Sequence, residues 1–219
     1  METMTQIITA LKAQKRNKQR INVHLEGEFA FGLSRKLSSL LEVGQELTPE
    51  EINELKGSDA VEASYLRALN FLSYRPRSQA EVIRNLRKHN TPEDQIEFVL
   101  EKLLSNKLVD DEKFAKLWVE NRSDFRPRGA YMLRMELLQK GIANNIIDEA
   151  LEGIEEDKLA YRAAIKRAER FKNLARVDFR KKLGGFLSRR SFKYEIISDT
   201  LSKVWEELKE DKEVSEVLK

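Results

Sequence analysis

Two patterns of apolar and polar positions divide the chain, and each predicts a different kind of element. Apolar residues alternate with polar ones over 21–25, and the extended pattern resumes over 29–31. Glu26-Gly27 between these runs is a typical turn sequence, so the pattern predicts a β-hairpin. The preceding run, 6–13, can add a third strand.

Short helices and a linker are predicted next. Ser34 can cap a helix over about 35–42. Thr48-Pro49-Glu50-Glu51 opens another short helix, because threonine at the N-cap, proline at the first helical position and acids in the first turn all favour initiation. Lys56-Gly57-Ser58-Asp59 has the composition of a linker. We therefore expect residues 1–60 to form a small N-terminal domain.

From Tyr65 onward the apolar positions follow a helical period, and they predict three sets of three helices. The first set carries Leu66, Leu69 and Leu72, then Val82, Ile83 and Leu86, then Ile96, Val99, Leu100 and Leu103. The second carries Phe114, Trp118 and Val119, then Tyr131, Leu133, Leu137 and Leu138, then Ile146, Ile147, Ala150 and Leu151. The third carries Leu159, Ala160, Ala164 and Phe171, then Phe179, Leu183, Phe186 and Leu187, then Ile196, Ile197, Leu201, Val204 and Trp205.

The sequence also repeats at a fixed distance. Arg75-Pro76-Arg77-Ser78 recurs 51 residues later as Arg126-Pro127-Arg128-Gly129. At that offset Leu86, Ile96, Leu100 and Leu103 map onto Leu137, Ile147, Leu151 and Ile154, and a degenerate third copy has Leu187, Ile197, Leu201 and Val204. A fixed period is typical of stacked repeat proteins, which are mostly binding surfaces.

The predicted fold is therefore mainly α. Three tandem three-helix repeats form an elongated array behind a small β-hairpin-containing domain. The expected boundaries are 61–109, 110–155 and 156–208 for the repeats, followed by a charged C-terminal tail over 209–219.

One residue marks the corner after the second helix of each repeat. Gly141 fits a left-handed helix cap, and Asn90 and Ser191 occupy the matching positions. Asparagine tolerates positive φ better than serine does. The third corner is therefore open to a different construction.

Charge is segregated along the chain, although the formal net charge is only +3. Residues 144–157 hold 6 acids and no base, residues 157–205 hold 14 bases against 5 acids, and residues 206–219 hold 6 acids and 3 bases. Each run alone is typical of a solvated helix face. Together, blocks of both signs favour a charged protein partner over a uniform polyanion, because acidic blocks repel phosphate. The basic stretch 12–20 is either a solvated strand connection or a polyanion contact.

Residues for catalysis or metal binding are scarce. Cysteine is absent and the two histidines, His24 and His89, are far apart, so no zinc spacing exists. Acid pairs such as Asp110-Asp111 and Glu155-Glu156 fall near predicted helix ends, where capping explains them. Gly184-Gly185 lacks the lysine and hydroxyl residue of a phosphate loop. We therefore expect no enzyme, no cofactor and no metal.

Localisation follows from three absences. No apolar run reaches the roughly 18 residues that a membrane span needs. The N-terminal residues lack a secretory signal pattern, and a chain without cysteine suits a reducing compartment. We expect a cytoplasmic monomer.

The order and spacing of several motifs resemble the RecX family. The motifs are Arg75-Pro76-Arg77-Ser78, Leu108-Val109-Asp110-Asp111 leading into Phe114-Ala115, Arg126-Pro127-Arg128-Gly129, Leu137-Leu138-Gln139-Lys140-Gly141-Ile142, and Leu187 through Arg190 with Phe192. The resemblance covers residues 64–205, and the hairpin segment is similar to an N-terminal extension of some members. It departs from the family at Asn90 and Ser191, where glycine is usual.

The resemblance implies a non-enzymatic regulator of the recombinase RecA. Such proteins bind the groove of the RecA–DNA filament and interfere with ATP hydrolysis, co-protease activity and strand exchange. DNA would then be contacted weakly or through the filament. The alternative is a stand-alone nucleic-acid-binding protein, because three-helix units can imitate helix-turn-helix modules.

Basic residues are the candidate partner-binding residues. At the Arg-Pro-Arg segments proline ends one helix and the next begins, but arginine there also offers bidentate donors for carboxylate or phosphate. In the third repeat a solvated face and partner binding both remain open, and we expect Arg189, Arg190 and Lys193 to be exposed. The candidates are Arg75, Arg77, Arg126, Arg128, Lys140, Arg167, Arg170, Lys181, Lys182, Arg189, Arg190 and Lys193.

Overall fold

The structure, a computed structural model, describes residues 4–217, with side chains described as far as residue 210. It divides into two compact units, residues 1–76 with 82–108 (unit 1) and residues 77–81 with 109–219 (unit 2). Within the described residues the regular structure comprises ten α-helices and one four-stranded sheet. The fold is mainly helical, as the sequence predicts.

The N-terminal sheet of unit 1 is antiparallel, with strand order β3-β2-β1-β4. Its strands are β1 (Gln6–Ala13), β2 (Arg20–Leu25), β3 (Glu28–Ser34) and β4 (Glu46–Leu47). Strands β2 and β3 form the predicted hairpin, and β1 is the predicted third strand. The turn residues Glu26 and Gly27 have φ of 50° and 87°. Positive φ at both positions matches the twist of the flanking strands.

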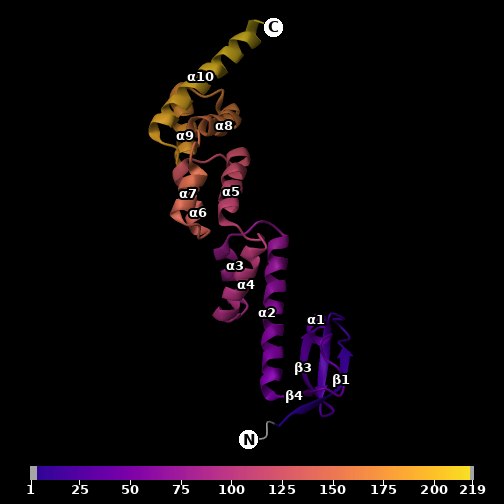
Figure 1. The fold of residues 1–219 in the computed structure, drawn as a ribbon. Coiled ribbons are helices and arrows are strands. Elements are labelled where there is room, and N and C mark those ends of the chain that lie inside the picture. Colours follow the sequence, from indigo (N-terminus) through magenta and orange to yellow (C-terminus); the bar gives the residue numbers. More distant parts are fainter. Residues whose placement is uncertain (1–3, 218–219) are drawn as a thin grey trace. The chain divides into compact units, whose positions relative to one another are not determined.

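The sheet packs beside the N-terminal part of α2 (Pro49–Ser73) (Figure 1). Ile52 of α2 joins the buried core of the sheet. The helix begins with a capping box, in which Thr48 Oγ1 accepts a hydrogen bond from Glu51 N at 3.2 Å and Glu51 Oε2 accepts one from Thr48 N at 2.8 Å. Two orphan donors at the helix start are thereby satisfied.

Helix α2 corrects two predictions from the sequence. It has 25 residues rather than a few, and it contains Lys56-Gly57-Ser58-Asp59, which was predicted to be a linker. The buried Asp59 carboxylate accepts hydrogen bonds from Ser34 N at 2.6 Å and from Arg20 Nη2 at 2.7 Å. These contacts offset the roughly 1 kcal/mol cost of Gly57 inside a helix. A linker composition reveals nothing about such distant partners.

Helix α1 (Arg35–Ser38) is shorter than the predicted 35–42. Ser34 caps it as expected, accepting from Leu37 N at 3.4 Å. The chain leaves the helix after Ser38, and Leu41 is buried in the core of the sheet instead of continuing a helical turn.

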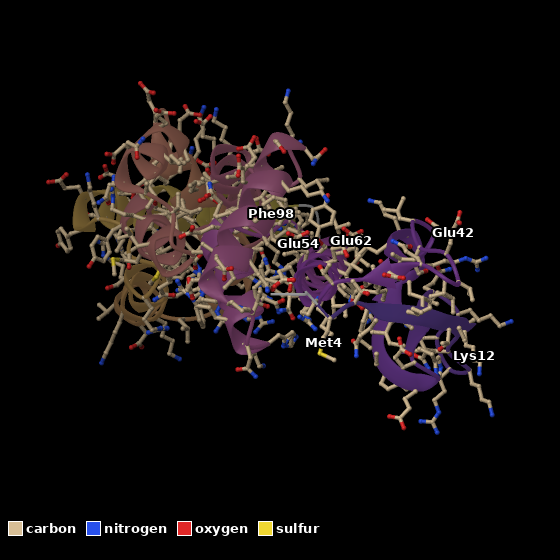
Figure 2. All side chains as sticks on the ribbon, turned by 60° about the horizontal axis from the view of Figure 1, so that its bottom comes forward. Met4, Lys12, Glu42, Glu54, Glu62 and Phe98 are labelled. Atoms are coloured by element: carbon tan, nitrogen blue, oxygen red, sulfur yellow. The ribbon has the colours of Figure 1, made fainter. Side chains whose placement is uncertain are left out.

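Helix α4 (Glu93–Ser105) packs on α2 within unit 1. Lys102 Nζ lies 3.8 Å from Glu62 Oε2 and 4.2 Å from the ring centre of Tyr65. Figure 2 labels Glu62 and Phe98, which come from these two helices and line one open pocket of about 480 Å³.

The predicted apolar stripe of α2 is wrong in one respect. Leu66 is exposed, and the buried positions in this part of the helix are Ser64 and Ala68. Small residues bring neighbouring elements close to a helix, whereas a periodicity count rewards only the large apolar side chains.

The remaining helices complete three sets of three. Helix α3 (Gln79–Lys88) comes between α2 and α4 in the chain; residues 79–81 fall in unit 2 and the rest in unit 1. The second set is α5 (Asp111–Phe125), α6 (Ala130–Gln139) and α7 (Asn144–Leu151). The third is α8 (Glu156–Ala168), extended by a 3₁₀ turn over Glu169–Phe171, with α9 (Arg176–Ser188) and α10 (Tyr194–Val217). Helix α10 therefore continues into the segment predicted as a tail, whose side chains beyond 210 lie outside the description.

The equivalent leucines of the repeats are all core residues. Leu86, Leu137 and Leu187 are fully buried, which confirms the predicted register. Leu137 lies in the core of the second set and Leu187 in the core of the third. Two residues predicted in the same stripe as Leu137, Tyr131 and Leu138, are exposed instead.

All three corners share one backbone turn. Asn90, Gly141 and Ser191 have φ of 57°, 80° and 61°. The residue after each of them donates its backbone amide to the carbonyl oxygen of the core leucine. The pairs are Thr91 with Leu86, Ile142 with Leu137 and Phe192 with Leu187. The serine corner is therefore built like the others. The hydrogen bonds and the buried leucine hold Ser191 in a conformation that its own preference disfavours.

Candidate functional site

The first corner of unit 2 consists of residues 78–81 with Lys140 and Gly141. Ser78 Oγ donates to Lys140 O at 2.6 Å and also accepts from Glu81 N at 3.2 Å. A Cβ on Gly141 would lie 2.4 Å from Ala80 Cβ. Gly141 therefore serves both a positive φ and a close approach.

An ion pair neutralises the first corner. Lys140 Nζ lies 2.9 Å from Glu81 Oε1, and the side chains are 24% and 10% exposed. Lys140 Nζ also lies 5.0 Å from the ring centre of Trp118. Lys140 was predicted to bind a partner, but its charge is already satisfied within the fold.

The second corner, residues 127–132 with Arg190 and Ser191, reaches the matching carbonyl oxygen with a backbone amide instead of a hydroxyl. Gly129 N donates to Arg190 O, and Arg190 Nη1 donates to Pro127 O, both at 2.8 Å. A Cβ on Gly129 would lie 2.1 Å from Ser191 O, so no other residue fits there without a shift. Arg190 is partly buried and hydrogen-bonded, which corrects the expectation that it is simply exposed.

Arg128 of this corner has an internal partner. Glu136, whose side chain is 12% exposed, accepts hydrogen bonds from Arg128 Nη1, from Arg122 Nε at 2.7 Å and from Trp118 Nε1 at 2.8 Å. These contacts join α5 to α6. They favour a structural role for Arg128 over the predicted partner contact.

Beside the second corner lies an open pocket of about 310 Å³, here called the corner pocket. Five cations and one carboxylate line it. The cations are Arg162, Lys166, Arg167, Arg170 and Arg190, and the carboxylate is Asp124. Asp124 Oδ1 lies 3.5 Å from Arg162 Nη1, and both side chains are largely exposed. Among the described residues, no carboxylate forms an ion pair with the other four cations.

Aromatic rings position two of these arginines. The guanidinium carbon of Arg190 lies 4.4 Å from the ring centre of Phe186, and that of Arg167 lies 5.5 Å from the rings of both Phe171 and Phe186. Burial lowers the pKa of Arg190, and neighbouring charges lower it further, in the order Arg128, Arg126 and Arg167. The corner pocket therefore has a repulsive field of like charges.

The structure thus separates the predicted site residues into three groups. Arg167, Arg170 and Arg190 come together in the corner pocket. Arg126 is exposed, and its charge contributes to the lowered pKa of Arg190. Arg128 and Lys140 are engaged internally. The others do not line the pocket. Lys181, Lys182, Arg189 and Lys193 are exposed, Arg75 is exposed and donates to Pro76 O, and Arg77 is partly buried.

Sequence reasoning missed Arg162, Lys166 and the exposed Phe125 of the corner pocket. A signal for the cations was present, because Arg162, Lys166 and Arg170 follow one another at four-residue spacing and so share a helix face. Phe125 directly precedes the Arg-Pro-Arg motif, as Tyr74 does in the first repeat, and both rings are exposed.

In the part of the chain that the structure describes, the geometry bears on metal ligation, helix capping by acids and membrane spanning. There, no group of three or more His, Asp or Glu side chains is arranged to hold a metal ion. Asp110 caps α5 by accepting from Lys113 N at 2.8 Å, as its position predicted. The described helices include none with the length and apolar character needed to span a bilayer.

A small antiparallel sheet followed by sets of three helices, with a cationic pocket at one corner, defines a helical-repeat protein. Sequence models of RecX domains match three of its segments. They are the regulatory protein RecX N-terminal domain over 6–48, the first three-helix domain over 65–103 and the second over 110–151. The protein belongs to the RecX family of regulatory proteins.

Relatives and solved structures agree with this assignment. The chain is 31% identical to the regulatory protein RecX of Bacillus pumilus, over 96% of this chain and 82% of the relative. It is 32% identical to the regulatory protein RecX of Bacillus subtilis, over 94% of this chain and 80% of the relative. A crystal structure of regulatory protein RecX superposes with a TM-score of 0.68 at 30% identity, covering 89% of this chain and 99% of that one. The crystal structure of RecX from Lactobacillus salivarius superposes with a TM-score of 0.59 at 28% identity, covering 67% of this chain and 97% of that one.

Proposed function

We propose that this protein is a non-enzymatic regulator that binds the RecA–DNA filament. It would inhibit ATP hydrolysis, co-protease activity and strand exchange, and so modulate DNA repair, recombination and the SOS response. Membership of a family of regulatory proteins over nearly the whole chain supports the proposal. We further propose that the protein acts in the cytoplasm as a monomer.

The corner pocket is the observation that carries this proposal. A stable fold does not need four cations without carboxylate partners, because exposed charges add little to stability and clustered like charges repel. A RecA–DNA filament presents phosphates and acidic protein surface, and either would relieve that repulsion. Unit 2 carries further exposed cations outside the pocket, Lys181, Lys182, Arg189 and Lys193.

The test is ATP hydrolysis by RecA on single-stranded DNA, measured across a titration of the protein. We expect saturable inhibition by the wild type. Arg170→Ala should shift the inhibition curve to about 10- to 100-fold higher concentration, since a charge-assisted contact contributes about 1.5–3 kcal/mol. Lys116→Ala, an exposed charge on α5 outside the pocket, is the matched control. Absence of inhibition by the wild type would contradict the proposal.

A second measurement separates the exposed charges from Arg190. Arg189→Ala and Lys193→Ala should leave the melting temperature nearly unchanged, because both side chains are exposed. Arg190→Ala should lower the free energy of unfolding by about 1 kcal/mol, since it removes the hydrogen bond to Pro127 O. If all three melt alike, the second corner is held together without the Arg190 side chain.

The alternative function is that of a stand-alone nucleic-acid-binding protein. The same pocket supports it, because phosphates of free DNA would also meet these cations. Titrating labelled DNA with and without RecA distinguishes the two. The filament regulator should bind tighter at physiological salt when RecA is present, because protein contacts add to the phosphate contacts. An affinity unchanged by RecA would favour the alternative.

A further inference from the structure

The corner pocket contains a hydrogen-bond donor that the fold leaves unused. Arg167 Nε is buried, and the described residues offer it no hydrogen-bond partner. Nε itself lies too deep to meet a ligand, but the guanidinium that carries it lines the corner pocket and has no carboxylate partner among the described residues, so an oxyanion at the rest of the group would supply the acceptors that the fold does not. Guanidinium groups suit oxyanions in particular, because their planar N–H groups match the geometry of phosphate oxygens.

The rings hold the arginines in place for such a ligand. Arg167 and Arg190 both lie against Phe186, so the ring limits the conformations of two long side chains before any ligand arrives. A guanidinium over a ring can still donate from its edge. Less entropy is then lost on binding than for free surface lysines.

Phe125 adds a flat apolar surface at the same place. Its side chain lines the corner pocket and is 77% exposed, although burying a phenylalanine side chain stabilises a fold by about 1.5–3 kcal/mol. Asp124, next to it, is the one carboxylate of the pocket and is already shared with Arg162. An exposed ring beside an anion site is the arrangement used to bind unpaired bases along a phosphate backbone.

We propose that the corner pocket binds one nucleotide unit of single-stranded nucleic acid. Arg167, Arg170 and Lys166 receive a phosphate of the backbone, and the neighbouring base stacks on Phe125. A duplex fits poorly, because its bases are paired and stacked and cannot lie against Phe125. An acidic peptide would satisfy the cations but would leave the ring without a partner.

This inference rests on the proposed function only for its setting, since a RecA filament carries single-stranded DNA. The binding itself needs no recombinase. It is therefore measured with the full chain alone, by fluorescence anisotropy with a labelled oligothymidylate. Three comparison probes have the same length or charge: an abasic oligonucleotide, a duplex and a poly-glutamate peptide.

Phe125→Ala should weaken binding of oligothymidylate about 10-fold, as expected for the loss of one base stack. The affinity of the Phe125→Ala protein for the abasic oligonucleotide should equal that of the wild type. Tyr194→Ala, another highly exposed aromatic outside the pocket, is the control and should bind like the wild type. An unchanged affinity of Phe125→Ala for oligothymidylate would overturn the stacking half of the proposal.

Lys166→Gln and Arg170→Gln should weaken the binding of both the oligothymidylate and the abasic oligonucleotide. Each should also reduce the slope of log affinity against log salt concentration by about one for each lost phosphate contact. Lys116→Gln should leave that slope unchanged. All of these positions are exposed, so folding is not at stake. Equal salt slopes for all variants would overturn the phosphate half. Tighter binding of duplex or poly-glutamate than of oligothymidylate would overturn the choice of ligand.

The two proposals fail in distinguishable ways. If RecA is inhibited but Phe125→Ala binds oligothymidylate like the wild type, the nucleotide pocket is wrong and filament regulation stands. If Phe125→Ala loses affinity but wild-type protein leaves RecA unaffected, the pocket stands and filament regulation is wrong.

Discussion

At both corners of unit 2 a hydrogen bond reaches the carbonyl oxygen of a basic residue, but the electrostatic results are opposite. In both, the segment after an Arg-Pro-Arg motif meets the carbonyl oxygen of a basic residue that precedes a left-handed turn, Lys140 in one and Arg190 in the other. At the first corner Glu81 neutralises Lys140. At the second corner the position 51 residues after Glu81 is Met132, and Arg190 faces other arginines.

This difference separates architecture from function. Both corners have a contact between the two chain segments, whereas only the first has an acid beside its basic residue. A corner whose charges are not neutralised within the fold is available to a charged ligand.

The largest expected effect tests whether the corners rest on equivalent cores. Leu137→Ala and Leu187→Ala should each lower the free energy of unfolding by about 2–5 kcal/mol, because each leaves a cavity in a fully buried position. Leu86→Ala should behave alike. Thermal melting measures these effects, with the partly exposed Leu138→Ala as a control of under about 1 kcal/mol. Unequal costs would show that the three repeats are not equivalent in packing.

The next effect is specific to the second corner. Gly129→Ala places a Cβ at 2.1 Å from Ser191 O, so the backbone must shift, at a cost of about 1–3 kcal/mol. Gly57→Ala is the control, because its Cβ meets nothing within 4 Å and it lies inside α2. That change should raise stability by about 0.5–1 kcal/mol. A stable Gly129→Ala protein would show that the close approach at this corner is not required.

Exchanging the acid between corners tests the electrostatic half of the comparison. Glu81→Gln should lower the free energy of unfolding by about 1.5–3 kcal/mol, because Lys140 loses a largely buried charged partner. Met132→Glu should change stability by less than about 1 kcal/mol, yet reduce oligothymidylate affinity several-fold by supplying the missing acid. Met135→Glu, on the same helix, is the matched control. Equal losses of affinity for both glutamates would indicate only a general charge effect.

The smallest effect is a pH dependence at the first corner. Burial raises the pKa of Asp111, although its Oδ1 accepts a hydrogen bond from Gln79 N at 2.9 Å. An acid with a raised folded pKa stabilises the fold when protonated, so its contribution is lost as pH rises from about 4 through the raised value. In the wild type, protonation of Asp111 should therefore add under about 1 kcal/mol to the free energy of unfolding as pH falls. Asp111→Asn should lack this gain when the free energy of unfolding is measured against pH.

Much of the fold was predictable because it depends on local and periodic features. The hairpin over β2 and β3, the third strand and the three sets of helices follow from apolar spacing and turn residues. The linker over 56–59 and the exposed Leu66 were wrong because both depend on distant partners. Asp59 turns a helix-breaking sequence into helix by binding Arg20, which lies 39 residues earlier.

The candidate site was predictable only as a composition. The excess of basic residues over 157–205 indicated where a polyanion could bind. The sequence could not separate Arg128, which binds Glu136 of the following helix, from Arg167, which lacks such a partner. Nor could it show that Phe125 shares a pocket with residues some forty positions later.

The sequence by itself determined the hairpin, most of the helices, the repeat period, the core leucines and the family, because these reside in residue type and spacing. Only the tertiary structure decided which charges are neutralised and which remain available. Ion pairing depends on distances of a few ångströms between side chains far apart along the chain, and the Coulomb energy falls with that distance. Two corners with the same motif therefore differ in charge, because Glu81 pairs with Lys140 in the first and Met132 stands at the matching position of the second.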